Sequence, residues 1–540
     1  MTITQDTRVS FTLNEKLVEA HPGETILQAA RREGIEIPHL CYSDGLAMAG
    51  NCRACVVEIE GERVLAPSCC RAPSDGMKVS TDNERARRSQ TLVLELLRGE
   101  VGDTSHTQHS ELDDWCQKHQ VKSSRFGGRE QPIQDVSHPA IAVNLESCIQ
   151  CTRCVRACRE EQMNDVIGLA FRGAHSQIVF DLGDDMGASS CVGCGECVQA
   201  CPTGALMPSG DVGLEEIDRE VDSVCPYCGV GCLLKYHIKD NQIRYVTGRD
   251  GPANKGRLCV KGRYGFDYVS HPERLTKPMI RKEGIPKGLN EFFDPADPSK
   301  MFREASWEEA LDFAAAGLQE TRDTIGANGL AGFGSAKGSN EEAYLFQKLV
   351  RAGFGTNNVD HCTRLCHASS VAALLEGIGS GAVSNQVEDA AHADVIVVIG
   401  ANPTGNHPVA ATFIKNAARK GATLIVMDPR RTDLARHADY FLQFRADTDV
   451  ALLNAMIHTI IDEDLTDQAF IESRTRNFKE LQERVKLFSP EEMAPICGID
   501  ADVIRRCARA YATSKGSIIF WGMGVSQHVH GTDNARCLIA

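Results

Sequence analysis

The residues of this chain with the clearest capacity for chemistry are its cysteines, of which there are 23 among 540 residues. Sixteen of them form four groups of four, separated within each group by mostly short stretches of chain. The groups are Cys41, Cys52, Cys55 and Cys69; Cys148, Cys151, Cys154 and Cys158; Cys191, Cys194, Cys197 and Cys201; and Cys225, Cys228, Cys232 and Cys259. Soft thiolates at such spacing bind iron–sulfur clusters or zinc. The sequence therefore predicts metal centres rather than disulfides.

The second and third groups share one spacing, C-x2-C-x2-C-x3-C, and Pro202 follows the third. This repeat matches the pattern of two-cluster bacterial ferredoxins, whereas zinc sites do not repeat in this way. In that pattern the fourth cysteine of each run binds the cluster of the other run. We therefore expect Cys158 to join the first three cysteines of the third group, and Cys201 to join those of the second. Two adjacent [4Fe–4S] clusters would form an electron conduit.

The first group has the spacing C-x10-C-x2-C-x13-C, which departs from the plant-type C-x4-C-x2-C pattern. Four thiolates around a loop that contains Gly45 and Gly50 still fit a [2Fe–2S] cluster. Cys70 lies beside Cys69 and is the alternative fourth ligand. We expect Cys70 instead to be a small buried hydrophobic residue.

The fourth group, C-x2-C-x3-C-x26-C, ends in a distant cysteine that Val260-Lys261-Gly262-Arg263 follows. Spacing alone leaves zinc open here, but the neighbouring clusters favour iron and sulfur. We expect a third [4Fe–4S] cluster. On its own, Lys261 would be read as a solvated surface lysine.

A different kind of cysteine occurs in the segment 360–370, Asp-His-Cys-Thr-Arg-Leu-Cys-His-Ala-Ser-Ser. A cysteine beside histidine can be a nucleophile, a metal ligand or part of the core. From the residues alone Cys362 and Cys366 are nearly equal candidates, and burial is the commonest fate of such cysteines.

Several polar loops follow predicted strands in the second half of the chain. The strand candidates are 329–335, 395–400, 423–427 and 517–520, and helical patterns alternate with them, which predicts parallel sheets. Loops at the carboxyl ends of parallel strands bind nucleotides. We expect such loops to hold a large nucleotide-bearing cofactor. The candidate residues are Lys337, Gly400, Asn402, Asp428, Arg430 and Asp449.

The first hundred residues predict smaller elements. Alternation over 9–20 indicates a hairpin, and 24–33 fits a helix that Gly34 closes. Thr81 and Glu84 predict a capping box for a helix that ends at Gly99. The polar segment 100–138 is expected to be a linker or a partner contact.

The bulk composition narrows the function classes. A formal charge of −15 argues against a nucleic-acid or anionic-membrane surface. No apolar stretch approaches the ~20 residues that span a bilayer, and no secretory signal precedes residue 8. Many unpaired thiols without an export signal indicate a reducing cytoplasm.

Three stretches together closely resemble formate dehydrogenases, namely 225–232, 334–342 and 357–367. More narrowly, the chain resembles the catalytic α subunit of cytosolic NAD-dependent enzymes of the molybdopterin oxidoreductase superfamily, over essentially its whole length. The implied fold class is multidomain α+β and α/β. The implied domains are a β-grasp [2Fe–2S] domain at 1–85, a helical or linker region at 86–138, a two-cluster ferredoxin domain at 139–215, a [4Fe–4S] domain at 218–275, and α/β catalytic domains at 276–540.

The resemblance also implies roles for particular residues. Cys366 would be the thiolate on molybdenum or tungsten, held by bis(molybdopterin guanine dinucleotide), and His367 its active-site neighbour. Lys261 would help electrons pass between the fourth-group cluster and a pterin. The polar loops, from Gly400 to Asp449, would hold the dinucleotide arms. The resemblance, not the spacing, selects Cys366 over Cys362.

The chain departs from this family in two respects. Many relatives carry an extra cluster, held by one histidine and three cysteines, ahead of the ferredoxin block. Here the region offers His106, His109 and His119 but only Cys116, so we expect that cluster to be absent. The family's catalytic arginine should lie beyond 521–524, and the chain stops within a helical pattern. We therefore expect a fragment that is inactive alone.

The implied reaction is the oxidation of formate to CO2, reversible in principle, with electrons leaving through the clusters to a flavin-bearing diaphorase subunit that reduces NAD. The sequence has no complete flavin or NAD fingerprint of its own. One alternative is a non-catalytic electron-transfer subunit of a respiratory NADH dehydrogenase-type complex, which gives no reason for the pair Cys366-His367. Another is a nitrate reductase of the same superfamily.

Overall fold

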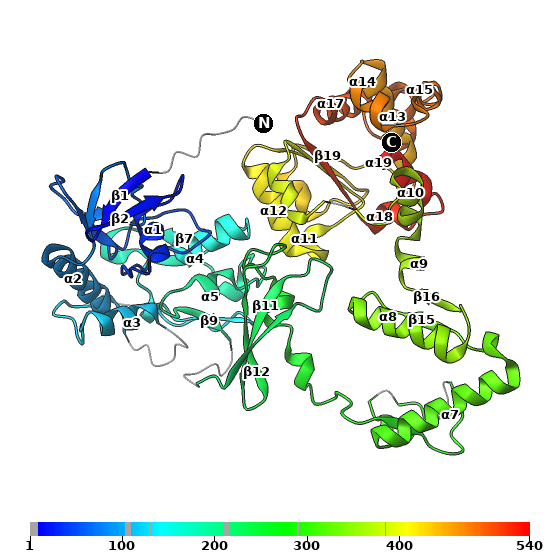
Figure 1. The fold of residues 1–540 in the computed structure, drawn as a ribbon, viewed down its shortest axis with the longest axis horizontal. Helices are drawn as coiled ribbons and strands as arrows, with labels where there is room; N and C mark the ends of the chain where they lie inside the picture. The colour runs from blue at the N-terminus through cyan, green and yellow to red at the C-terminus, as the bar shows by residue number, and fades with distance from the viewer. Residues whose placement is uncertain are drawn as a thin grey trace. The chain divides into compact units, whose positions relative to one another are not determined.

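The computed structural model spans the chain and describes residues 9–102, 110–128, 132–209, 216–288, 291–294, 296–383 and 385–540. They form two compact units (Figure 1). The first unit comprises 1–266 with the inserted segment 403–420, and the second comprises 267–402 and 421–540. The inserted segment carries α11 (Pro403–Asn406) and α12 (Pro408–Arg419).

The first unit begins with a five-stranded sheet of order β2-β1-β5-β3-β4. Its elements are β1 (Val9–Leu13), β2 (Lys16–Ala20), α1 (Ile26–Arg32), β3 (Val56–Ile59), β4 (Ala66–Pro67) and β5 (Lys78–Ser80). Asn14 and Glu15 adopt positive φ in the turn of the expected hairpin, and Gly34 follows α1 at φ 75°. The apolar faces of the sheet and of α1 share one buried core, which fixes the loops that carry the first group of cysteines.

The predicted cap of α2 (Glu84–Glu100) is wrong. Asn83 accepts the backbone N–H of Ala86 and is the N-cap, while Thr81 is held by the hairpin through Asn14. Asn14 bonds both the hydroxyl and the backbone N–H of Thr81, so the side chain is not free to cap the helix. The helix also continues past Gly99 to residue 100, and the polar segment after it contains α3 (Glu111–Lys118).

The remainder of the first unit consists of short elements around the other cysteine groups. They are β6 (Ile141–Val143), α4 (Arg153–Arg156), β7 (Ile167–Ala170), β8 (Gln177–Phe180), α5 (Glu196–Ala200), β9 (Leu206–Pro208), β10 (Arg219–Val224), β11 (Leu233–Lys239), β12 (Gln242–Gly248) and α6 (Val260–Tyr264). A π-helical turn over Ala157–Glu161 extends α4. Strands β6 and β9 pair, as do β7 and β8, while β10, β11 and β12 form an antiparallel sheet.

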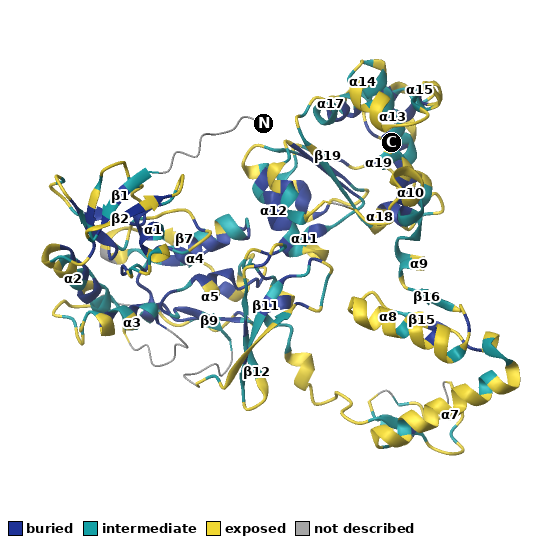
Figure 2. Cartoon of the chain, in the orientation of Figure 1, coloured by how far each residue is buried: buried dark blue, intermediate teal, exposed yellow. Residues whose placement is uncertain are grey.

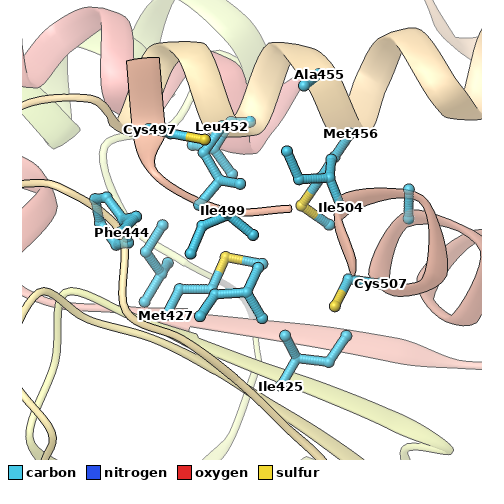
Figure 3. Close-up of a cluster of buried hydrophobic side chains, with 14 of the residues drawn as sticks. Ile425, Met427, Phe444, Leu452, Ala455, Met456, Cys497, Ile499, Ile504 and Cys507 are labelled. Atoms are coloured by element: carbon cyan, nitrogen blue, oxygen red, sulfur yellow. The ribbon is translucent and has the colours of Figure 1, made fainter. Parts of the chain in front are cut away.

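The second unit is organised around a parallel sheet of order β19-β18-β17-β20. The strands are β17 (Val395–Ile399), β18 (Thr423–Met427), β19 (Tyr440–Leu442) and β20 (Ser517–Trp521). β17 is buried along its full length, as expected for a strand covered on both faces. Figure 3 shows Ile425 and Met427 of β18 facing Leu452 and Ile504 in a closely packed core. Cys497 and Cys507 fill this core and are fully buried.

The helices that complete this part are α13 (Asp449–Asp462), α14 (Gln468–Arg474), α15 (Phe478–Val485), α16 (Pro490–Cys497), α17 (Ala501–Ala512), α18 (Met523–Ser526) and α19 (Gly531–Ile539). Every predicted strand is present, although the first is shortened to β15 (Gly332–Gly334), which pairs in parallel with β16 (Val359–His361) in a separate two-stranded sheet.

Ahead of that sheet lie β13 (Met279–Arg281), β14 (Phe302–Glu304) and α7 (Trp307–Ile325), and around it lie α8 (Asn340–Lys348), α9 (Thr363–Cys366) and α10 (Ala368–Ile378). Ser306 caps α7 and Ser339 caps α8. None of the residues of α7 is buried (Figure 2). In the second unit, α9, α10 and the parallel sheet carry most of the residues for which the sequence predicts a chemical role.

Candidate cofactor sites and electron relay

The first group of cysteines converges within the N-terminal sheet domain. The Cys41 thiol shares hydrogen bonds with Cys52 and Cys69, and Cys55 bonds Cys69. Hydrogen bonds from Cys52 and Cys69 lower the pKa of the Cys41 thiol, which favours its thiolate form. Cys41, Cys52 and Cys55 lie between α1 and β3, and Cys69 follows β4. Four converging thiols of this kind are a suitable donor set for a two-iron cluster.

Cys69 and its neighbour Cys70 differ in burial. Cys69 is 1% exposed and shares hydrogen bonds with the thiols of Cys41 and Cys55, whereas Cys70 is exposed. The expectation that Cys70 is buried is therefore wrong: its side chain lies outside the core, 3.5 Å from the Cys69 sulfur.

This difference gives a direct prediction for the ligand. We expect Cys69→Ser to lose the visible and EPR spectrum of the [2Fe–2S] cluster, because a buried ligand is removed. Cys70→Ser is the matched control and should retain the spectrum. The reverse pattern would assign the ligand role to Cys70.

The second and third groups are interleaved. Burial raises the pKa of the Cys151 thiol, and electrostatic repulsion from Cys201 raises it further. Burial likewise raises the pKa of Cys194, with Cys158 among its charged neighbours. The structure therefore brings together the two exchanged sets that the ferredoxin spacing predicts.

A cavity marks the first of these sets. Its walls include Cys148, Cys151, Cys154 and Cys201, and apolar side chains such as Ile178 and Leu206 complete the lining. Thiols buried in an apolar cavity lose their protons at high free-energy cost unless a cation is bound. The donor set thus fits a buried cationic cluster.

The fourth group also converges. Burial raises the pKa of Cys232 to about 12, and the nearby Cys225, Cys228 and Cys259 add to the effect. The first three thiols lie between β10 and β11, and Cys259 begins α6. Lys261 is exposed on α6. Its role in electron transfer to or from a pterin, which the family resemblance implies, stays a proposal.

A buried ion pair joins the third and fourth groups. Arg263 is 3% exposed; its guanidinium bonds the Glu196 carboxylate at 2.8 Å and the Cys194 carbonyl at 2.7 Å. Glu196 also accepts the backbone N–H of Leu258, which precedes Cys259. This network holds α5 and α6 together and so fixes two cysteine sites relative to each other.

The region predicted to lack a further cluster is partly described. Cys116 is buried in an apolar cluster with Leu94 and Leu112, and burial raises the pKa of its thiol to about 11. The His119 ring contacts the Thr91 hydroxyl. His106 and His109 lie outside the described residues. Cys116 is placed as a core residue.

The catalytic candidates Cys366 and His367 lie in the second unit, where one helix ends and the next begins. Cys366 is the last residue of α9, and His367 departs from helical geometry with φ −145° and ψ 28° before α10 starts. The Cys366 sulfur is half-buried, 3.1 Å from the sulfur of Met523, while Cys362 is exposed. The His367 Nδ1 atom is buried and has no hydrogen-bond partner.

Hydrogen bonds tie α10 to β20 and to α18. The Ser369 hydroxyl donates to the Ser526 carbonyl at 2.6 Å, and Trp521 donates through its indole N–H to Ser370 at 3.0 Å. Cys366 and His367 are therefore positioned against the carboxyl edge of the parallel sheet. Sequence reasoning missed Met523 and these serines, whose contacts join segments more than 150 residues apart.

The predicted nucleotide loops occupy the same edge of the sheet. Gly400 follows β17 at φ 56°, and a Cβ there would lie 2.8 Å from the backbone of Gly524. Asp428 follows β18 and accepts the backbone N–H of Arg430, whose side chain is exposed. Asn402 continues the loop after β17. Three loops thus meet where parallel strands commonly bind nucleotides.

Asp449 is the clearest sign of a ligand at this edge. Its carboxylate is 1% exposed, and neither oxygen has a hydrogen-bond partner in the protein. Burial raises its pKa, and the nearby Asp447 and Asp428 raise it further. The Thr432 hydroxyl is buried without a partner as well, and sequence reasoning missed it. Unpaired buried polar groups are unfavourable and need an explanation, and donors on a bound nucleotide base would satisfy them.

We expect Asp449→Asn to stabilise the cofactor-free protein by about 1–3 kcal/mol at neutral pH, because it removes an unpaired buried charge. The folded-state pKa is raised, so wild-type stability declines as the pH rises through it. The advantage of the variant should therefore shrink as the pH falls. Thermal melts at two pH values test this, and nucleotide content of the loaded protein should fall in the variant. A variant less stable than the wild type would contradict the interpretation.

Lys337 lies in the loop after β15 and is exposed. β15 pairs with β16 in the separate two-stranded sheet, so Lys337 follows a different sheet from the other predicted nucleotide loops. In the described parts of the chain, no three histidine, cysteine, aspartate or glutamate side chains are arranged to hold a single metal ion.

No described helix is long and apolar enough to cross a membrane.

Four protein families match the chain in succession. They are a 2Fe-2S iron-sulfur cluster binding domain at 6–84, a 4Fe-4S dicluster domain at 147–205, a molybdopterin oxidoreductase Fe4S4 domain at 218–271, and molybdopterin oxidoreductase at 274–539. The third match covers the fourth cysteine group, for which spacing alone left zinc open.

Curated relatives match almost the entire chain. "Putative formate dehydrogenase YrhE" of Bacillus subtilis is 31% identical over 98% of this chain and 57% of its own length. "Putative formate dehydrogenase SAR2393" of Staphylococcus aureus is 30% identical over 98% of this chain and 56% of its own length. The chain thus spans little more than half the length of these relatives.

A solved structure, the acetylene hydratase of Pelobacter acetylenicus, shares the fold with a TM-score of 0.50 and 25% identity, covering 59% of this chain and 42% of its own. The chain belongs to the molybdopterin oxidoreductases, as a member whose oxidoreductase domain follows one 2Fe-2S domain and further 4Fe-4S domains.

Proposed function

We propose that this chain oxidises formate, HCOO⁻ → CO2 + H⁺ + 2e⁻, and passes the electrons through its clusters to a partner that reduces NAD. The observation that carries the proposal is the pair Cys366-His367 at the break between α9 and α10, with a buried ring nitrogen that has no protein partner. Relatives of similar sequence carry the name formate dehydrogenase.

The resident cofactor in this proposal is molybdenum or tungsten bound by bis(molybdopterin guanine dinucleotide). When bound, it accepts the two electrons that formate releases. Cys366 would hold the metal through its sulfur. Lys337, Gly400, Asn402, Asp428, Arg430 and Asp449 would hold the dinucleotide arms. Asp449 fits this role best, because both its oxygens are buried and unpaired.

His367 would manage the proton. Its Nδ1 atom is buried and free of protein partners, so it can accept the proton that leaves formate.

Electrons would leave singly through three [4Fe–4S] sites and one [2Fe–2S] site. Lys261 lies two residues after Cys259 and would assist electron transfer between the cluster of the fourth group and a pterin. A flavin-bearing diaphorase subunit is the proposed acceptor, because the chain has no complete flavin or NAD fingerprint. We propose a cytoplasmic location, since all 23 cysteines are free thiols in the structure.

Elemental analysis of the purified holoenzyme, combined with formate-dependent and nitrate-dependent viologen assays, tests the proposal. We expect one molybdenum or tungsten per chain and activity with formate. Activity with nitrate alone would indicate a nitrate reductase. Iron without molybdenum, tungsten or pterin would indicate an electron-transfer subunit without catalysis.

A further inference from the structure

One arginine links the cysteine site of the N-terminal domain to that of the ferredoxin block, both within the first unit. The Nη2 atom of Arg156 donates to the Cys41 carbonyl at 2.5 Å and lies 3.4 Å from the Cys151 carbonyl. Its Nη1 atom donates to the Ala47 carbonyl. The carbonyls of one cysteine from each site are therefore within reach of a single guanidinium nitrogen.

Two further side chains contribute to this junction, one from the N-terminal domain and one from the ferredoxin block. Asn51, next to Cys52, donates its amide to the Cys151 carbonyl and to the Thr152 hydroxyl, both at 3.2 Å. Arg153, which is 6% exposed, lies 3.5 Å from the Leu40 carbonyl and is paired with both oxygens of Glu111 at 2.8 and 2.9 Å. The contacts thus concentrate on residues at or beside the cysteines.

The space between the two sites is a continuous apolar core. Cys41 and Cys151 belong to the same buried cluster, together with Leu40, Leu94 and Ile149. Cys116 is part of this cluster, and it is the only cysteine between Cys70 and Cys148 in the sequence. The chain therefore cannot supply three thiolates for another cluster in this stretch. The described residues Leu94, Leu112 and Cys116 pack in the same core.

Packing alone does not explain the charges at this junction. Arg153 and Arg156 each have a buried Nε atom without a partner, which is unfavourable in an interface that only needs to be filled. A reduced cluster carries more negative charge than an oxidised one. Positive charge and hydrogen bonds near its cysteines therefore stabilise the reduced form and raise its reduction potential.

We propose that the site of Cys148, Cys151, Cys154 and Cys201 exchanges electrons directly with the site of Cys41, Cys52, Cys55 and Cys69, and that Arg156 is the positioning residue of this junction. In each transfer one electron leaves the reduced [4Fe–4S] cluster and reduces the [2Fe–2S] cluster. No bond forms or breaks, and no proton is required. The inference rests on the cluster ligation that we propose, but not on formate as the substrate.

Electron paramagnetic resonance of the dithionite-reduced holoenzyme tests the junction without any substrate. We expect the [2Fe–2S] signal to relax faster, and to broaden, once the neighbouring [4Fe–4S] cluster is reduced. A [2Fe–2S] signal that relaxes as an isolated cluster under these conditions would overturn the proposal. Because dithionite supplies the electrons, a failure here is separate from a failure to oxidise formate.

Redox titration of variants tests the role of Arg156. We expect Arg156→Gln to shift the potentials of both clusters downward, because a positive charge and two hydrogen bonds are lost. Arg156→Lys keeps the charge and should shift them less; it also serves if the glutamine variant loses iron. Arg159→Gln is the matched control, since Arg159 is exposed on the same turn and pairs with Asp165. Equal potentials in the Arg156→Gln and Arg159→Gln proteins would remove Arg156 from the junction.

Discussion

Formate oxidation is expected to disappear when Cys366 is replaced with serine, while the iron–sulfur spectrum of the enzyme remains. The sulfur of Cys366 is the only protein atom that we propose to bind the molybdenum or tungsten. Removing groups that merely support metal ligands lowers activity or affinity by ~10–100-fold. Loss of the ligand itself should exceed that range. The measurement is turnover with formate and an artificial acceptor, together with iron content.

Cys362→Ser is the matched control, because Cys362 lies four residues away in the same segment and its side chain is exposed. It should retain near wild-type turnover. A large loss in Cys362→Ser with normal activity in Cys366→Ser would exchange the two assignments that the sequence left open. Equal loss of iron in both proteins would indicate damage to the fold instead.

The second large effect concerns the buried pair of Arg263 and Glu196. Arg263→Met leaves the Glu196 carboxylate buried without its cation, since the two side chains are 3% and 7% exposed. Breaking such a pair from one side costs about 3–5 kcal/mol. For a domain of 150–250 residues this corresponds to a fall in melting temperature of roughly 6–20 °C. We expect the melting transition of the first unit to move by this amount, with loss of cluster iron.

A double substitution separates charge from packing. Glu196→Gln removes the negative charge but keeps an oxygen that can accept the Leu258 N–H, so Arg263→Met with Glu196→Gln should be more stable than Arg263→Met alone. Arg505→Met is the control for an exposed pair, because Glu491 is largely solvated, and we expect little change. A double variant no more stable than the single variant would show that the charge is not responsible.

The spacing of cysteines predicted which thiols meet, because ligand sets impose their own sequence intervals. The exchange of Cys158 and Cys201 between the two ferredoxin runs follows from that rule, and the structure brings those residues together. The expectation that Cys70 is buried was wrong, since its side chain is exposed. Cys69 and Cys70 lie in the turn that follows β4, where the direction of each side chain depends on the fold, so spacing cannot choose between them.

Long-range contacts set the limit of prediction from one sequence. Strand and helix patterns located β17, β18 and β20 and so the edge at which Gly400 and Asp428 lie. They gave no indication that Met523 and Ser526 meet the segment around Cys366, because that contact depends on how distant elements pack. Thr81 failed as a cap for a similar reason, since Asn14 on the hairpin holds it.

The central claim is tested most directly by X-ray absorption spectroscopy at the molybdenum or tungsten edge of the holoenzyme, compared with its Cys366→Ser variant. We predict that the wild type has one more sulfur neighbour on the metal than the variant has. An identical sulfur shell in the two proteins would contradict the assignment of Cys366 as the metal ligand, and with it the account of formate oxidation at this site.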